Sequence, residues 1–161
     1  MKRREHDFSQ LVESHKSTIY TICYMFADNS LQADDLFQEV LIRLWQGFDS
    51  FRGDSQVATW VWRVSLNTCI SVERKERKHR TVRLDMKSDF YADMSAENRQ
   101  IKALHDRISR LQPIDRAIVL LWLESMSYEE IAAIVGISVK SLSVRLYRIK
   151  EQLKQMSNKS E

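Results

Sequence analysis

Apolar residues recur at spacings of three and four along most of the chain, a period that is typical of helices packed on one face. In the N-terminal part this pattern predicts a first helix from Phe8 to Phe26. Residues 28–30 break the pattern, and Ser30 can cap the helix that follows. That second helix stops near Gly47, and its apolar face consists of Leu36, Phe37, Val40, Leu41, Leu44 and Trp45.

A loop over residues 48–56 separates this helix from a third one, predicted from about Val57 to about His79. The third helix is apolar on two sides, with Val57, Val61, Val64 and Thr68 on one and Trp62, Leu66 and Ile70 on the other. A helix with two apolar sides belongs inside a bundle. Residues 1–80 are therefore expected to form one helical domain.

The helical period fades between residues 81 and 97, a stretch made acidic by Asp85, Asp89, Asp93 and Glu97. It resumes at Ile101 and continues through Trp122. Residues 81–100 are therefore predicted to be an acidic linker, and residues 101–161 a second helical domain.

Composition supports an all-α fold. The chain has 161 residues, of which 43% are hydrophobic and 29% charged, enough for a packed core. It contains only three glycines and one proline, whereas a sandwich or barrel with many tight turns needs more. We predict two helical domains joined by a linker.

No pattern of residues indicates catalysis, a cofactor or a metal site. Cys23 and Cys69 lie in apolar helical patterns without a metal-ligand spacing, which favours reduced core residues. The four histidines form no visible site, and there is no glycine-rich phosphate loop. The charged N-terminus leads into no apolar signal segment, and no stretch approaches the length of a membrane span. A cytoplasmic protein without membrane insertion is expected.

The clearest local pattern lies in residues 127–142 and predicts a helix-turn-helix. Ser127 and Glu130 have the spacing of a capping box. Gly136 stands where a helix needs a left-handed terminator, and Ser138 can cap the next helix. The next helix has an apolar stripe of Val139, Leu142, Leu146, Ile149 and Leu153.

The opposite side of that helix is basic, and it is the candidate DNA-binding surface. Its residues are Lys140, Ser141, Val144, Tyr147 and Arg148, with Arg145 at the edge. Such side chains can neutralise phosphates and contact base edges in a major groove. The alternative is an ordinary basic surface on a helical hairpin. A net charge of only +3 does not decide between the two.

A second basic surface runs along the third helix. Trp60, Arg63, Asn67, Ser71 and Arg74 form one ridge, which continues into the basic residues Lys75, Arg77 and Lys78. Aromatic, amide and basic groups in a row suit single-stranded or opening DNA. Trp60 by itself fits a buried core position better, because tryptophan is usually buried. Residues 74–80 fit phosphate contacts better than a solvated helix end.

A third candidate surface lies on the second helix, opposite its apolar face. Asp35, Gln38, Glu39, Ile42 and Gln46 place one isoleucine among carboxylates and amides. Such a surface suits docking on a basic partner helix, but single exposed apolar residues are also normal. Helix geometry alone leaves the two interpretations equal.

These segments together resemble the extracytoplasmic-function (ECF) group of bacterial sigma factors, over nearly the whole chain. Residues 34–45 look like the family's polymerase-binding helix. Residues 48–55 and 59–67 look like the segment that opens and recognises the minus-10 promoter element. Residues 127–146 are similar to the helix-turn-helix that recognises the minus-35 element. The order and spacing of these segments identify the family more specifically than any one segment does.

The resemblance implies a sigma factor that directs core RNA polymerase to promoters and is held in check by an anti-sigma factor. On the polymerase it implies contacts with the β′ clamp coiled coil, through Asp35, Gln38, Glu39 and Ile42, and with the β flap. At the minus-10 element it implies contacts by Phe51, Arg52, Trp60, Arg63, Asn67, Arg74, Lys75, Arg77 and Lys78.

Three positions depart from the family pattern. Ser71 stands where an aspartate is common, and Ser143 where a lysine or arginine is usual. Lys140 occupies a position often held by a small residue. These differences bear on promoter preference and leave the predicted fold unchanged.

Two alternatives of other classes stay open. An autonomous helix-turn-helix regulator would usually carry a ligand or receiver domain where residues 8–45 lie. A sigma mimic that only titrates an anti-sigma factor would not need the basic groups at residues 74–80 and 140–148. An enzyme is the least favoured class.

Overall fold

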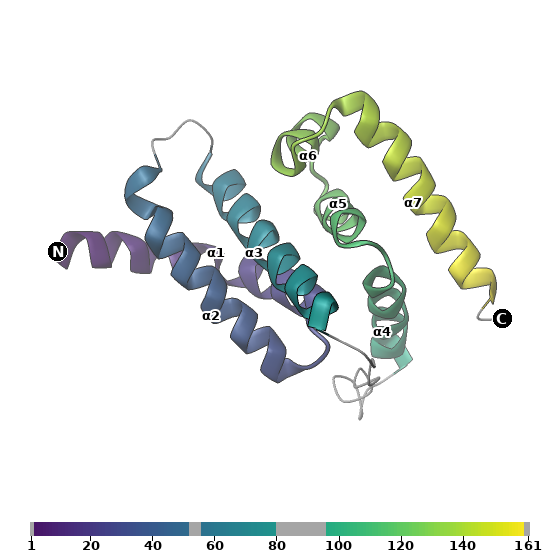
Figure 1. Cartoon of the computed structure of the whole chain (residues 1–161), viewed down its shortest axis with the longest axis horizontal. Coiled ribbons are helices and arrows are strands. Elements are labelled where there is room, and N and C mark those ends of the chain that lie inside the picture. The colour runs from purple at the N-terminus through teal and green to yellow at the C-terminus, as the bar shows by residue number, and fades with distance from the viewer. Residues whose placement is uncertain (1, 52–55, 80–95, 160–161) are drawn as a thin grey trace. The chain divides into compact units, whose positions relative to one another are not determined.

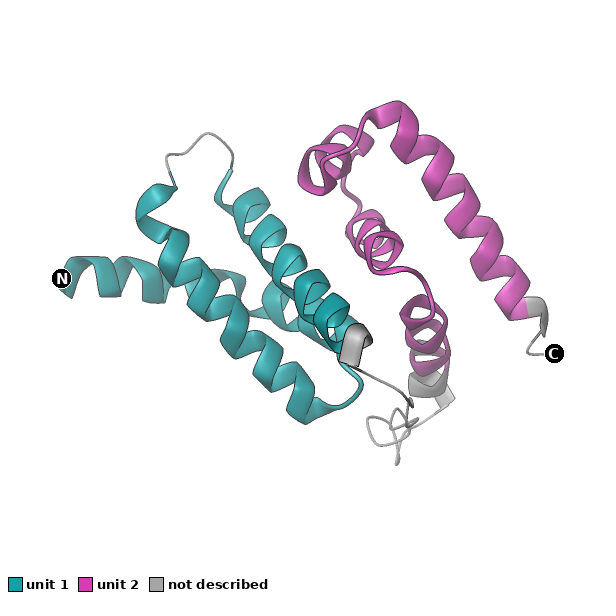
Figure 2. Ribbon diagram, viewed as in Figure 1, with its two compact units in different colours: residues 1–87 teal, residues 88–161 magenta. Residues whose placement is uncertain are grey.

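A computed structural model describes residues 2–51, 56–79 and 96–159, and in these ranges every regular element is helical (Figure 1). The chain divides into two compact units, residues 1–87 and residues 88–161 (Figure 2). The predicted fold class, all-α with two helical domains, is confirmed.

The first unit is a bundle of three long helices with one short 3-10 helix. It comprises α1 (Lys2–Phe26), α2 (Ser30–Gly47), η1 (Phe48–Ser50) and α3 (Val57–His79), and each long helix packs against the other two. The fully buried hydrophobic side chains are Ile19, Ile22, Cys23, Val40, Leu44, Val61 and Cys69. Both cysteines are free, as expected for core residues.

Polar side chains close the turn between α1 and α2. Asn29 caps α2, because its Oδ1 accepts a hydrogen bond from the Gln32 amide at 2.8 Å. The expected cap, Ser30, was therefore wrong by one residue: Asn29 has the extended backbone that a cap requires, whereas Ser30 is already helical. Gln32 also donates from Nε2 to the Glu76 carboxylate, at 2.9 and 3.2 Å, and so joins α2 to α3.

The N-terminal end of α1 extends beyond Phe8, where the apolar pattern begins. Arg4 accounts for this extension. Its Nε lies 3.0 Å from Asp49 Oδ1, and its guanidinium carbon lies 4.0 Å from the centroid of the Trp45 ring. Phe8 packs edge-on against Trp45, with ring centroids 5.0 Å apart. These contacts fix the end of α2 and η1, where the loop toward α3 begins.

The second unit comprises α4 (Ala96–Ser109), α5 (Pro113–Leu123), α6 (Tyr128–Val135) and α7 (Val139–Lys159). Helices α5, α6 and α7 pack on one another. The large side chains of this core, each at most 1% exposed, are Ile108, Ile118, Leu121, Ile131, Leu142, Leu146 and Ile149.

Helix α4 begins inside the segment expected to be the linker, residues 81–100. Residues 96–100 are Ala-Glu-Asn-Arg-Gln, most of which favour helix, yet they contain no large apolar residue. A search for an apolar period therefore detects this helix only from Ile101. Residues 80–95 lie outside the described residues.

A buried arginine joins α5 to the end of α4. Arg116 is only 2% exposed. Its Nη2 donates to the carbonyl oxygens of Ser109 and Leu111, at 2.7 and 3.3 Å. The last carbonyls of a helix have no partner within the helix, so a buried donor at this position stabilises the α4–α5 turn.

Replacing Arg116 by methionine should lower the free energy of unfolding by roughly 1–3 kcal/mol, because two carbonyls of the turn lose a charged donor. Urea unfolding of the full chain, followed by circular dichroism, measures this. The control is Arg110→Met, an exposed arginine in the same turn, for which we expect a change within about 0.5 kcal/mol. Equal losses for the two variants would contradict the proposed importance of the buried donor.

Candidate nucleic-acid and protein-docking interfaces

The helix-turn-helix of the second unit has the predicted caps. The Ser127 hydroxyl accepts from the Glu130 amide and the Glu130 carboxylate accepts from the Ser127 amide, both at 3.2 Å, which completes a capping box. Gly136 ends α6 with a left-handed φ of 81°. Ser138 caps α7 by accepting a hydrogen bond from the Ser141 amide at 3.1 Å. All four sequence-based expectations are confirmed.

Helix α7 buries its apolar stripe and exposes the opposite side. Lys140, Ser141 and Arg148 are exposed, and Val144 is 50% exposed. These four residues line one open groove along the helix. The prediction that Val139 belongs to the buried stripe was wrong. It is 40% exposed because it is the first residue of α7, ahead of the turn at which the packed stripe begins.

Arg145 differs from the other expected DNA-binding residues because it has a partner within the protein. Its Nε lies 2.5 Å from Oδ1 of Asp115, which belongs to α5. Its side chain is 40% exposed, so it lies at the edge of the basic surface, as predicted.

Tyr147 lies on this surface, as the sequence predicts. Its side chain is 68% exposed, the highest value among the large hydrophobic residues of α7. It lies between Val144 and Arg148 on the same helix face and lines the same groove. The spacing of three from Val144 is the signal that identifies it in the sequence.

The ridge on α3 is partly exposed. Asn67, Arg74 and Lys75 are exposed, and Arg63 is half-buried. Trp60 is also half-buried, so it is neither a fully buried core residue nor a fully exposed residue of the ridge. Its ring stacks on Phe51, with centroids 5.0 Å apart and planes at 30°, so the two aromatic residues form one platform. Arg52 lies outside the described residues, as do the side chains of Arg77 and Lys78.

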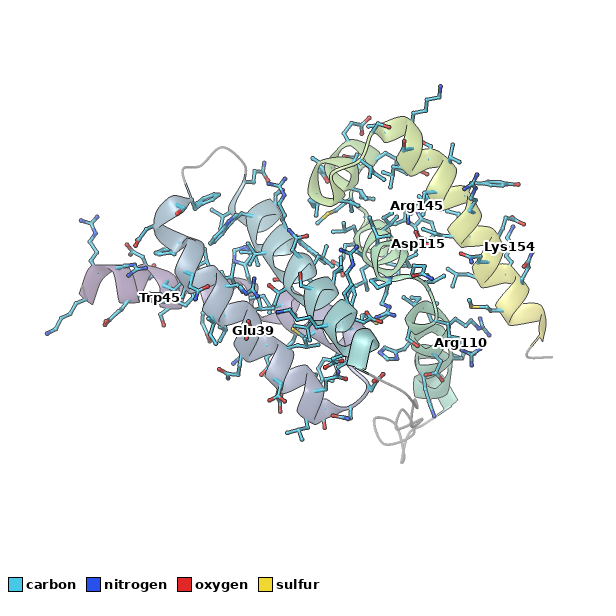
Figure 3. The ribbon with its side chains drawn as sticks, in the orientation of Figure 1. Glu39, Trp45, Arg110, Asp115, Arg145 and Lys154 are labelled. Atoms are coloured by element: carbon cyan, nitrogen blue, oxygen red, sulfur yellow. The ribbon has the colours of Figure 1, made fainter. Side chains whose placement is uncertain are left out.

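The polar side of α2 is open to solvent. Asp35 and Gln38 are exposed, and Ile42 is 50% exposed. Glu39 is paired along the helix with Arg43, at 3.3 Å (Figure 3). These four residues of the predicted docking face are thus accessible on the same helix.

Among the described residues no cluster of three His, Cys, Asp or Glu side chains is arranged to hold a metal ion. No helix in the described ranges is long and apolar enough to cross a membrane.

A helical unit with an exposed polar face on α2, followed in the same chain by a capped helix-turn-helix with a basic outer face, defines a two-unit DNA-binding protein. Residues 11–79 match the model of Sigma-70 region 2, and residues 101–153 match that of Sigma-70 region 4. The two matches cover most of the chain. The chain belongs to the sigma-70 family, in its ECF group.

Relatives of known function and a solved structure agree with this placement. The chain is 28% identical over 170 residues to the ECF RNA polymerase sigma factor SigW of Bacillus subtilis, covering 96% of this chain and 91% of SigW. It is 28% identical to SigG of Mycobacterium tuberculosis, covering 90% of this chain but 40% of SigG. The sigma factor RpoE of Bartonella quintana, solved with the anti-sigma factor NepR, shares the fold with a TM-score of 0.76. That likeness covers 94% of this chain and 97% of RpoE at 22% identity.

We predict that Lys140→Ala and Arg148→Ala each weaken binding of the full chain to duplex DNA. Each should also make the dependence of log K on log salt shallower by about 0.9, because one phosphate contact is lost. Fluorescence anisotropy with a labelled duplex over a salt series measures both quantities. Arg110→Ala removes an exposed arginine outside α7 and should leave the slope unchanged. Equal slopes for all three variants would exclude the outer face of α7 from phosphate contact.

Proposed function

We propose that this chain directs core RNA polymerase to specific promoters and helps to open the DNA for transcription initiation. The observation that carries the proposal is the coupling, in one chain, of a region 2 unit with an exposed docking face and a region 4 unit with an exposed recognition helix. Neither surface holds a set of reacting groups. On this proposal the chain acts by binding, in the cytoplasm, and the polymerase supplies the chemistry.

The exposed face of α2 is the proposed polymerase-docking surface. Ile42 offers an apolar contact, and Asp35 and Gln38 offer polar groups around it. A central apolar residue within a polar rim is the usual composition of a protein–protein contact. The β′ clamp coiled coil is the proposed partner, with the β flap as a second contact of the polymerase.

The loop between η1 and α3, together with the ridge on α3, is the proposed minus-10 site. Bases of an opening strand gain stacking energy on aromatic rings, and the Phe51–Trp60 platform offers such a surface. Arg63, Asn67, Arg74 and Lys75 follow along α3, where they can bind the backbone and base edges. Arg52, Arg77 and Lys78 complete this proposed set.

The outer face of α7 is the proposed minus-35 site. Lys140 and Arg148 supply charge for phosphates or guanine edges. Val144 and Tyr147 supply apolar surface, which fits the methyl group of thymine. Residues 1–80 are proposed to carry the polymerase and minus-10 contacts, residues 101–161 the minus-35 contacts, and residues 81–100 the connection between them.

An anti-sigma factor is the proposed regulator of this chain. The Bartonella quintana structure that shares its fold is a complex of a sigma factor with an anti-sigma factor. Binding of such a partner would cover the surfaces needed for polymerase or DNA and so keep the chain inactive.

Run-off transcription tests the proposed function. Sigma-free core polymerase, the purified chain and promoter fragments from the source genome should yield discrete transcripts that share a two-part upstream sequence. No transcript from a folded preparation free of anti-sigma factor would contradict the proposal. Binding to an anti-sigma factor in that case would favour a sigma mimic, and operator binding without polymerase would favour an autonomous regulator.

Replacing Ile42 by glutamate should weaken binding to core polymerase at least tenfold, because a charge replaces the apolar centre of the proposed contact. Titration of labelled chain with core polymerase measures this affinity. Thr21→Glu places the same charge on an exposed position of α1 and serves as the matched control. If both variants bind core polymerase as the wild type does, the docking surface lies elsewhere.

A further inference from the structure

Asp115 and Arg145 connect the first turn of α5 to the recognition helix (Figure 3). The Arg145 Nε donates to Asp115 Oδ1 at 2.5 Å, although the two residues are thirty positions apart in the sequence. The Asp115 side chain is only 14% exposed, whereas that of Arg145 is 40% exposed. The carboxylate thus belongs to the interior edge of the groove, and the guanidinium extends from it toward solvent.

The position of the Asp115 carboxylate is fixed by the backbone around it. Asp115 lies in the first turn of α5, two residues after the proline that begins the helix, where a negative charge is favoured. Its neighbour Arg116 is bonded to the carbonyls that end α4. Adjacent side chains therefore join α5 to α4 on one side and to α7 on the other.

Arg145 keeps donors available after pairing with Asp115. A guanidinium has five N–H groups, and Asp115 accepts from Nε. Within the part of the chain that the structure describes, no protein acceptor is bonded to Nη1 or Nη2 of Arg145. Lys140, Ser141, Val144 and Arg148 line the same groove. The remaining donors of Arg145 lie at the rim of the proposed minus-35 surface.

We propose that Asp115 is a positioning residue for DNA binding: it holds the Nε edge of Arg145 so that the Nη groups bind one phosphate of the duplex. An arginine that is already oriented loses less side-chain entropy when it forms a bidentate contact. This inference rests on the proposed assignment of α7 to duplex DNA. It gives Asp115, a partly buried acid that the sequence-based analysis did not select, a role in binding an anion.

The proposal predicts that removal of the Asp115 charge changes DNA affinity in the direction opposite to the one that simple electrostatics predicts. A carboxylate near DNA repels phosphates, so its removal should strengthen binding by charge alone. If Asp115 orients Arg145, then Asp115→Asn weakens binding instead. Glu151 lines the same groove and contacts Lys154 rather than Arg145, so Glu151→Gln removes the same charge as a matched control.

The experiment uses the full chain and a labelled 30-base-pair duplex of mixed sequence, over a salt series. We expect Asp115→Asn to weaken binding roughly three- to tenfold, within the range seen for coupled side chains. Arg145→Ala should weaken binding and make the salt dependence shallower by about 0.9. In the Arg145→Ala background, Asp115→Asn should weaken binding no further. Glu151→Gln should leave binding unchanged or tighter.

Three results would overturn the proposal: tighter binding by Asp115→Asn, equal weakening by Asp115→Asn with and without Arg145, or no duplex binding by the wild-type chain at low salt. Asp115→Glu retains a carboxylate and should recover affinity relative to Asp115→Asn, which separates positioning from a loss of folding. The mixed-sequence duplex requires neither promoter nor polymerase. If run-off reactions give no transcript but duplex binding depends on Asp115, only the proposed function is contradicted. If transcripts appear but duplex binding does not depend on Asp115, only this inference is contradicted.

Discussion

Burial of the apolar faces of the packed helices stabilises each unit by itself, and the position of every candidate interface depends on it. On α7, Leu142, Leu146 and Ile149 are at most 1% exposed, whereas Val144 and Tyr147 on the other side are 50% and 68% exposed. The hydrophobic effect acts on the buried side only and places no demand on the opposite side. That opposite side is therefore available for binding, on α7 as on α2.

Polar side chains supply the directional contacts that apolar packing lacks. Arg116 bonds to the carbonyls at the end of α4, and Gln32 joins α2 to the Glu76 carboxylate on α3. Arg4 contacts both the ring of Trp45 and the carboxylate of Asp49. Each of these contacts lies at the end of a helix, where unpaired backbone groups and chain reversals require a defined geometry. They set the orientation of the segments from which the proposed binding surfaces extend.

The three proposed interfaces use different physical interactions. The face of α2 combines one half-exposed isoleucine with carboxylates, which suits a basic protein surface. The Phe51–Trp60 platform offers stacking, which suits unpaired bases, and α7 combines cations with apolar groups, which suits the edges and phosphates of a duplex. The proposed function needs all three kinds of binding.

The helical class, the bounds of α3 and the caps of the helix-turn-helix could be predicted from the sequence, because these features depend on residues within one or two turns. Ser127, Glu130, Gly136 and Ser138 act as their spacing predicts. The sequence also identified the open faces of α2 and α7, since a helical period defines both sides of a helix at once. Only the tertiary structure decided that Asp115 pairs with Arg145, that Phe51 stacks on Trp60 and that Arg4 reaches Asp49. Contacts of this kind join separate elements, and they depend on how the helices pack and turn against one another, which no local pattern encodes.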